Sequence, residues 1–348
     1  MQNPARYFLL DPNNFLNSPR VPFVEERKAA QLLAADAVGA LHSQRLDQAQ
    51  EDLHALARLA QLHRDDMTLV SQMIRVAITG LELSATWEAL QIKGWTDEDL
   101  TALQKDWEEV DLFNALEKGM LGSRAHGENV IAWTRDASVQ QRIQTLGMSA
   151  GPPWTKDDLS NWGFMLLWRM SSQSDELLML QTFQKNLDSI RRLQRGTPWK
   201  QVQAEIKLCA DGLQAKENSP LLRIRYYFSL IMMNPNYSKA AASVVRNETQ
   251  RRLTVTAIAL ERYRLRQGRF PADLGALVPR YLSAVPMDPM SGKPLCYRLN
   301  ADGTFTLYSV GEDGVDDGGD PNPSSVTNQF GLWSGKDAVW PAADIGGR

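Results

Sequence analysis

The chain has 348 residues, enough for two domains or one large one, and 43% of them are hydrophobic, which is sufficient to form buried cores. Its formal net charge of -3 excludes the strong basic character that nucleic-acid or membrane-surface binding would favour. The two cysteines, Cys209 and Cys296, could pair, but their spacing indicates no disulfide framework and leaves the redox compartment open.

No stretch approaches the roughly 18 uninterrupted apolar residues of a membrane-spanning helix. The densest apolar runs, residues 164–168 and 230–233, are far shorter. The N-terminus lacks a basic region followed by an apolar one, so we expect no signal peptide within this sequence, while a leader or anchor upstream of it stays open.

Helical periodicity begins after residues 1–23, which are rich in turn signals and are expected to form an irregular lead-in. Residues 24–44 and 46–63 place apolar side chains at helical spacing, which predicts two antiparallel helices with a short connection. The expected inner face of the second helix consists of Ala49, Leu53, Leu56, Ala57 and Ala60.

A third helix is expected over residues 67–92, capped by Asp65 or Asp66. Its predicted inner face holds Leu69, Met73, Ile74 and Ala77. A further helix should begin after Thr96, because Asp99 follows three residues later and acidic residues fill the first turn, where the helix dipole favours them.

The same capping pattern recurs at Thr155 and Asp158, after a break at residues 151–153, and we interpret it as shared capping chemistry and not as a repeat. Further helices are expected over residues 176–194, 198–215, 219–233 and 237–267. Gly268 is the predicted C-cap of the last and longest of them. Residues 221–233 are too apolar for a free linker, so the regions before and after them should share an interface.

The last of these helices carries a stripe of arginines between Arg246 and Arg269. The stripe fits either a docking face for an acidic partner or a solvated face with ion pairs one turn apart, and the pattern favours the solvated face. The four histidines, His42, His54, His63 and His126, show no metal-ligand spacing and are expected to be surface or capping residues.

Strand-like alternation appears only after the long helix, over residues 294–300 and 304–310. Gly303 lies between the two segments and predicts a β-hairpin whose turn requires a positive φ. The predicted inward residues are Leu295, Tyr297 and Leu299 on the first strand and Phe305 and Leu307 on the second.

Residues 308–320 combine five carboxylates and four glycines with no lysine or arginine. Charge alone favours a solvated acidic loop. The same residue types also suit calcium, which takes about six to eight oxygen ligands from carboxylates and from carbonyls that glycine turns leave free. An EF-hand is excluded, because Ser325 and Gly331 stand where that motif needs glycine and glutamate.

Residues 249–337 resemble the globular part of the major pseudopilin of type II secretion systems. The end of the long helix matches through Tyr263, Gly268, Arg269, Phe270 and Pro271, and the following turn through Val285, Pro286, Asp288 and Pro289. The end of the hairpin matches through Leu307, Tyr308, Ser309, Gly311, Asp313 and Gly314. The whole chain is also similar to uncharacterised bacterial envelope proteins that place a helical region before such a module.

The resemblance implies a calcium-binding loop after the hairpin. Residue matching places the carbonyl of Val310 and the side chains of Asp313 and Asp320 on ligand positions, with Asp316, Asp317 and Asp337 as further candidates. The helix that forms the filament core in pseudopilins corresponds here to an internal, arginine-rich helix, so filament assembly is not implied.

The combined expectation is an α+β protein, with an all-α region at residues 1–234 and a pseudopilin-like module at residues 235–348, in which a long helix packs on a small antiparallel sheet. We expect a non-enzymatic structural or interaction protein of the bacterial cell envelope, exported or anchored through a segment outside this chain, with a cytoplasmic location still open. Its partner should be a protein, not a nucleic acid. The alternatives are a helical-repeat adaptor with a peptide groove within residues 24–92 and, less favoured, a metal-dependent hydrolase that uses the acidic cluster.

Overall fold

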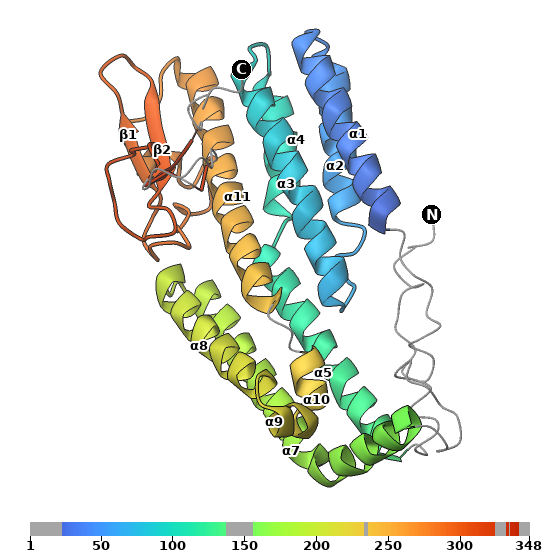
Figure 1. The fold of residues 1–348 in the computed structure, drawn as a ribbon. Coiled ribbons are helices and arrows are strands. Elements are labelled where there is room, and N and C mark those ends of the chain that lie inside the picture. The colour runs from blue at the N-terminus through green and yellow to red at the C-terminus, as the bar shows by residue number, and fades with distance from the viewer. Residues whose placement is uncertain (1–22, 137–155, 233–235, 324–331, 334, 341–348) are drawn as a thin grey trace.

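The computed structural model describes residues 23–136, 156–232, 236–323, 332–333 and 335–340 (Figure 1). Helices dominate these residues, and a three-stranded antiparallel sheet follows them, so the predicted α+β class is confirmed. None of the helices in these ranges is both long and apolar enough to cross a membrane.

The first two helices, α1 (Phe23–His42) and α2 (Leu46–Ala60), form the predicted pair with a short connection. The inner face expected for α2 is confirmed, because all five of its residues are buried. The periodicity of α2 gives a clear signal since the helix lies at the edge of the bundle and buries a single stripe.

The third helix, α3 (Leu69–Gln91), differs from its prediction. Thr68 caps it by accepting a hydrogen bond from the amide of Ser71, while Asp66 bonds to His63 instead. Ala77 is exposed, and Leu69, Met73 and Ile74 are only half-buried. The physical reason is that α1, α2, α5 and α11 all contact α3, so the helix buries most of its circumference, polar side chains included.

The middle of the chain forms α4 (Asp97–Glu108), α5 (Leu112–Asp136), α7 (Lys156–Gln194), α8 (Trp199–Glu217), α9 (Pro220–Arg225) and α10 (Tyr227–Met232). The capping box predicted at Thr96 and Asp99 is present. The second predicted cap falls on Thr155, which lies outside the described residues. The helix expected over residues 219–233 is two short helices that meet at Tyr226.

The long helix predicted before the hairpin is α11 (Asn236–Gln267). Gly268 follows its last residue with a φ of +73°, as expected of the C-cap. It lies between the helical region and the sheet, in contact with α3, α4 and α5 on one side and with β2 on the other (Figure 1). The larger of two hydrophobic clusters in the described residues includes side chains from Ala37 to Trp340 and crosses the predicted boundary at residue 234. The predicted shared interface is therefore present among the described residues.

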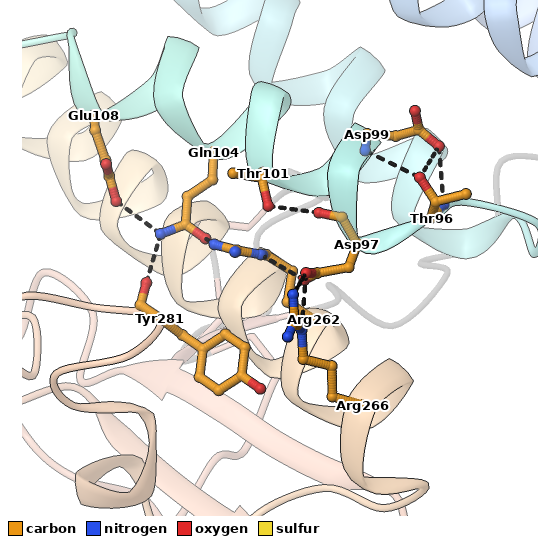
Figure 2. Close-up of polar contacts among 9 residues, drawn as sticks. All are labelled: Thr96, Asp97, Asp99, Thr101, Gln104, Glu108, Arg262, Arg266 and Tyr281. Carbon is orange, nitrogen blue, oxygen red and sulfur yellow. Dashed lines mark hydrogen bonds and ion pairs between the residues drawn. The ribbon is translucent and has the colours of Figure 1, made fainter.

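Polar contacts also join α4 to α11 (Figure 2). The carboxylate of Asp97 accepts hydrogen bonds from Arg262 at 3.0 Å and from Arg266 at 2.9 Å. Gln104 accepts a bond from Arg262 at 2.9 Å and donates one to the carbonyl of Tyr281 at 2.7 Å. Partial burial raises the pKa of Asp97, but the hydrogen bonds from Arg266 and Arg262 outweigh it and hold that pKa below its usual value.

Several arginines of the stripe on α11 donate hydrogen bonds to carboxylates and carbonyls of this chain. Buried Glu248 accepts bonds from Arg251 at 2.8 Å and from Arg252 at 2.7 Å. The same two guanidinium groups donate to the carbonyls of Trp107 and Met287, far away in sequence. The prediction of a solvated face is therefore wrong for Arg251, Arg252 and Arg262, which tie α11 to other elements.

The sheet contains β1 (Cys296–Leu299), β2 (Phe305–Ser309) and β3 (Ala338–Trp340) in the order β1-β2-β3. The predicted hairpin is confirmed, with Tyr297 opposite Leu307 and a φ of +82° at Gly303, but Leu299, which was expected to point inward, is exposed near the end of β1. The short 3-10 helix η3 (Leu274–Leu277) lies between α11 and the sheet in the chain. Strand β3 returns beside β2 and brings Asp337 next to the acidic loop.

Candidate metal loop

The acidic loop starts where β2 ends, and a buried carboxylate fixes this start. Asp288 is 1% exposed and accepts hydrogen bonds from the Ser309 hydroxyl at 2.8 Å and the Val310 amide at 3.2 Å. Burial raises the pKa of Asp288 in spite of these bonds. The Asp-Pro turn that carries part of the pseudopilin resemblance thus positions the first residue of the loop.

Basic residues from elsewhere in the chain offset part of the loop's charge. Arg246 of α11 bonds to Glu312 at 2.6 Å, and Lys200 of α8 donates to the carbonyl of Asp313 at 2.9 Å. Lys336 forms an ion pair with Asp320 at 2.9 Å, and this pairing lowers the pKa of Asp320. The sequence shows no such compensation, because these cations lie outside the acidic stretch and reach it only in the folded chain.

Asp337 closes the loop from the first residue before β3. Its carboxylate is buried and accepts hydrogen bonds from the amides of Gly319 at 2.8 Å, Asp320 at 3.1 Å and Asp317 at 3.4 Å. The Asp337 amide in turn donates to the carbonyl of Asp320 at 3.0 Å. Burial raises the pKa of Asp337, against the opposing effect of the amide bonds. Asp337 therefore approaches the loop as the resemblance implies, but its oxygens already have donors.

The other predicted ligand side chains differ in how many of their carboxylate oxygens accept hydrogen bonds from the protein. Asp316 accepts a bond from the Tyr308 hydroxyl at 2.9 Å and one from the amide of Gly318 at 3.0 Å. Within the described part of the chain, the side chain of Asp313 accepts a hydrogen bond only from the amide of Val315, at 3.0 Å, through one of its two oxygens. The described residues provide no hydrogen-bond donor for the carboxylate of Asp317. With respect to the described residues, oxygens of Asp313 and Asp317 therefore remain without a donor.

These residues lie in one loop without forming a preassembled cage of side chains. No group of three His, Cys, Asp or Glu side chains within the described ranges converges as metal ligands would. For calcium to take Asp320 as a ligand, the ion pair between Asp320 and Lys336 would have to open. The fit to calcium thus depends on backbone carbonyls and on a rearrangement of this ion pair.

His63 and His54 have close carboxylate partners that sequence spacing did not reveal. His63 is buried, and its two ring nitrogens lie 2.9 Å from oxygens of Asp66 and Glu26. The expectation of a surface or capping role is therefore wrong for His63. His54 on α2 bonds to Asp106 on α4 at 2.9 Å and stays exposed. The partner of His54 is 52 residues away, and Glu26 is 37 residues from His63, so local pattern could not indicate either contact.

Comparison with known proteins adds no relative to this description. The resemblance to pseudopilins accordingly rests on the motifs around Gly268, Asp288 and Asp313 and stays a hypothesis. No protein-family model, no curated protein and no solved structure matches the chain.

Proposed function

We propose that this chain is a non-enzymatic structural or interaction protein of the bacterial cell envelope, and that residues 235–348 form a module related to type II secretion pseudopilins. The observation that supports the proposal is the order of elements: a long helix α11, a turn anchored by Asp288, a hairpin, an acidic loop and a closing strand. This order is the one that the resemblance implies.

The use of the loop carboxylates supports a structural role over a catalytic one. Asp288 and Asp337 are buried, and their carboxylate oxygens accept hydrogen bonds from backbone amides and from one hydroxyl. Carboxylates committed in this way hold a loop in shape and leave little freedom for proton transfer to a substrate.

Cell fractionation tests the location. In the organism that makes this protein, antibody detection should find the chain in the membrane, periplasmic or exported fractions. Marker proteins for the cytoplasm and for the envelope serve as controls for leakage. Recovery of the chain entirely with the cytoplasmic marker would contradict the proposed envelope location. It would not bear on the proposed relation of the module to pseudopilins.

We further propose that the acidic loop binds one calcium ion through Asp313, Asp320 and the Val310 carbonyl, with Asp316, Asp317 or Asp337 completing the shell. Calorimetric titration of calcium into chelator-treated protein should show a single site. Lys336→Gln should bind several-fold more tightly, because calcium then no longer competes with the ammonium group bonded to Asp320. At a hundredfold excess over the Kd, binding should stabilise the fold by about 2.7 kcal/mol.

The controls for the calcium experiment separate a specific site from general charge. Asp313→Ala should abolish binding, whereas Asp211→Asn on the exposed surface of α8 should leave it unchanged. No heat at ~1 mM calcium, a concentration at or above the Kd of weak extracellular sites, would contradict the calcium proposal. Equal binding by Asp313→Ala would contradict the ligand assignment.

The alternative function, a helical-repeat adaptor, would need a groove among the N-terminal helices, and a cleft of about 640 Å³ lies there between α2 and α4. Its walls include Ala57 and Ala102, but charged residues such as Arg58, Lys105 and Glu109 also line it. The cleft is thus not the apolar groove that a helical-repeat adaptor would present, and a peptide in it would have to carry charges of both signs.

A further inference from the structure

The N-terminal half of α7 presents an apolar face at the surface of the protein, and this half forms the lower edge of the view in Figure 1. Trp168, Ser172 and Asp175 lie on its inner side and are buried. Its outer side carries four exposed apolar side chains, namely Leu166, Leu167, Met170 and Leu177. Met170 is the most exposed of them, at 82%. Apolar side chains that gather on one helix face in this way are typical of an interaction surface.

The same face of α7 changes character in the second half of the helix. Continuing from Leu177 at helical spacing, its exposed residues are all polar, namely Gln181, Gln184, Lys185 and Asp188. Other exposed leucines of the protein are flanked by charge. Leu32 of α1, for example, has Lys28 and Asp36 one turn away on either side. The first half of α7 thus differs both from the rest of its own face and from a single exposed leucine.

The spacing of the exposed residues indicates what fits this face. Leu166, Met170, Gln173 and Leu177 are all exposed and follow one another at intervals of four, three and four residues. This is the spacing at which one helix packs along another in a coiled coil. We call these four residues the α7 seam. At a rise of 1.5 Å per residue the seam is about 16 Å long, which suits a short contact with another helix.

Two residues of opposite charge lie along one edge of the α7 seam. Arg169 is exposed and pairs with no acidic side chain in the described part of the chain. Glu176 follows seven residues later, two turns along the same edge. One oxygen of Glu176 pairs with Arg135 of α5 at 2.6 Å, and the side chain stays 28% exposed. The edge therefore presents a cation at one end and an accessible carboxylate at the other.

The opposite edge of the α7 seam carries a single charge. Arg225 of α9 reaches it and donates to the hydroxyl of Ser174 at 3.2 Å. The only other charged residue of α7 between residues 163 and 180 is Asp175, which is buried. The seam therefore has charges of opposite sign along one edge only, and an occupant that matches it needs the same two charges in reverse order.

We propose that a second copy of this chain docks on the α7 seam, so that two α7 helices pack antiparallel about a two-fold axis. The axis passes between Met170 and Gln173, and Leu166 then lies opposite the partner's Leu177. The same symmetry places Arg169 beside the partner's Glu176, and it repeats this ion pair at the other end of the contact.

The charges distinguish this arrangement from a parallel one. In a parallel pair Arg169 would lie beside the partner's Ser174 and gain no opposite charge. In the antiparallel pair the two copies of Arg225 lie about 10 Å apart along the helices, roughly one Debye length, so their repulsion is largely screened. The α7 seam precedes residue 235, so this inference does not rest on the relation of the C-terminal module to pseudopilins.

Sedimentation velocity of the full chain over a range of concentrations tests the dimer. We expect a reversible equilibrium between monomer and dimer with a Kd on the order of 10 µM, because so short a seam buries less than the ~800 Å² per partner of a standard interface. Met170→Glu places two like charges near the axis and should raise the Kd at least about tenfold. Leu32→Glu is the matched control, since Leu32 is also an exposed apolar residue, and its Kd should equal that of the wild type. Neither variant should lower the Tm, because both side chains are exposed.

Disulfide crosslinking tests the direction of the two helices. The double variant Leu166→Cys/Leu177→Cys should form a covalent dimer under mild oxidation, because the antiparallel pair brings these two positions together. Leu166→Cys alone should not, since its two copies lie about 16 Å apart, well beyond the ~7 Å limit between the Cα atoms of a disulfide. The wild type, with its half-buried Cys209 and Cys296, measures the background.

Four outcomes would overturn the proposal. They are a monomer at every concentration, a dimer that Met170→Glu leaves unchanged, a dimer that Leu32→Glu weakens equally, and a covalent dimer from Leu166→Cys alone, which would indicate a parallel pair. Vesicles of phosphatidylglycerol and phosphatidylethanolamine test a different occupant. If a monomeric wild type bound them and Met170→Glu did not, the α7 seam would face a membrane surface, and the second copy would be wrong.

Discussion

Replacing Asp175 with alanine should destabilise the protein by about 3–5 kcal/mol, the range found when one partner of a buried charged hydrogen-bond network is removed. Asp175 lies on α7 with no exposed surface. Its carboxylate accepts bonds from the indole of Trp168 at 2.8 Å and from the amides of Phe228 and Ser229 at 2.9 Å each. The Ser229 hydroxyl also donates to it, at 2.5 Å.

The size of this effect follows from the groups that would lose their acceptor. The amides of Phe228 and Ser229 belong to the first turn of α10, where no carbonyl of the helix can accept from them. Phe228 and Trp168 are buried and contact each other edge to face, with ring centroids 4.9 Å apart. Loss of the carboxylate would leave the indole and both amides without this acceptor beside a buried aromatic contact.

Urea denaturation measures the change in the free energy of unfolding. Asp188→Ala is the matched control, because Asp188 is an aspartate of the same helix with a side chain that is 58% exposed, and it should change stability by less than about 0.5 kcal/mol. Asp175→Asn should fall between the two, since it keeps one acceptor oxygen. A loss below about 1 kcal/mol for Asp175→Ala would mean that α10 does not depend on this anchor.

Local signals in the sequence predicted the elements whose partners are close along the chain. The capping box of α4 involves Thr96 and Asp99, and the hairpin turn has its positive φ at Gly303. The inner face of α2 was also predictable, because the helix lies at the edge and buries one stripe. In each case the relevant information lies within one or two turns of backbone.

Side-chain contacts between residues far apart along the chain could not be predicted from the sequence. Asp175 and the amide of Ser229 are 54 residues apart, and Arg262 and Asp97 are 165 residues apart. Nothing in the residues around Asp175 or Asp97 distinguishes them from surface aspartates. The sequence predicts the acidic loop as a unit, but the two lysines and the arginine that offset its charge come from α8, α11 and the approach to β3.

The interior of α3 shows a second limit of periodicity. A helix that other helices surround buries polar residues as well as apolar ones, so the apolar stripe no longer marks the inner face. Glu82 is the extreme case: it has no exposed surface, and neither of its carboxylate oxygens has a hydrogen-bond partner among the described residues. A buried carboxylate without a donor is expensive in its charged form.

Because of this cost, we expect Glu82 to make the free energy of unfolding strongly dependent on pH. Burial, and to a lesser extent the negative charge of Asp106, raises the pKa of Glu82 well above its usual value of 4.5. As the pH rises above 4.5, the unfolded chain releases this proton while the folded chain retains it. The free energy of unfolding should then fall by about 1.4 kcal/mol per pH unit until the folded protein ionises as well.

Glu82→Gln removes the titration while keeping the size of the side chain. Relative to the wild type, its stability should therefore increase by about 1.4 kcal/mol per pH unit as the pH rises above 4.5, until the folded wild type ionises, as measured by urea denaturation at each pH. Asp97 and Glu248, whose pKa values are lowered by their arginine partners after burial has raised them, contribute slopes of the opposite sign. Both residues are present in the wild type and in the variant, so their contributions cancel in the difference.

Two further variants separate ionisation from the unsatisfied polar atoms. Glu82→Leu should show the same pH-dependent gain as Glu82→Gln and, in addition, a gain of about 1–3 kcal/mol at every pH, because leucine leaves no polar atom without a partner. Glu109→Gln, a change at an exposed carboxylate of the neighbouring region, should keep the wild-type pH profile. If the wild type and Glu82→Gln ran parallel from pH 4.5 to pH 7, Glu82 would have to be ionised in the fold, and an unidentified donor would have to reach it.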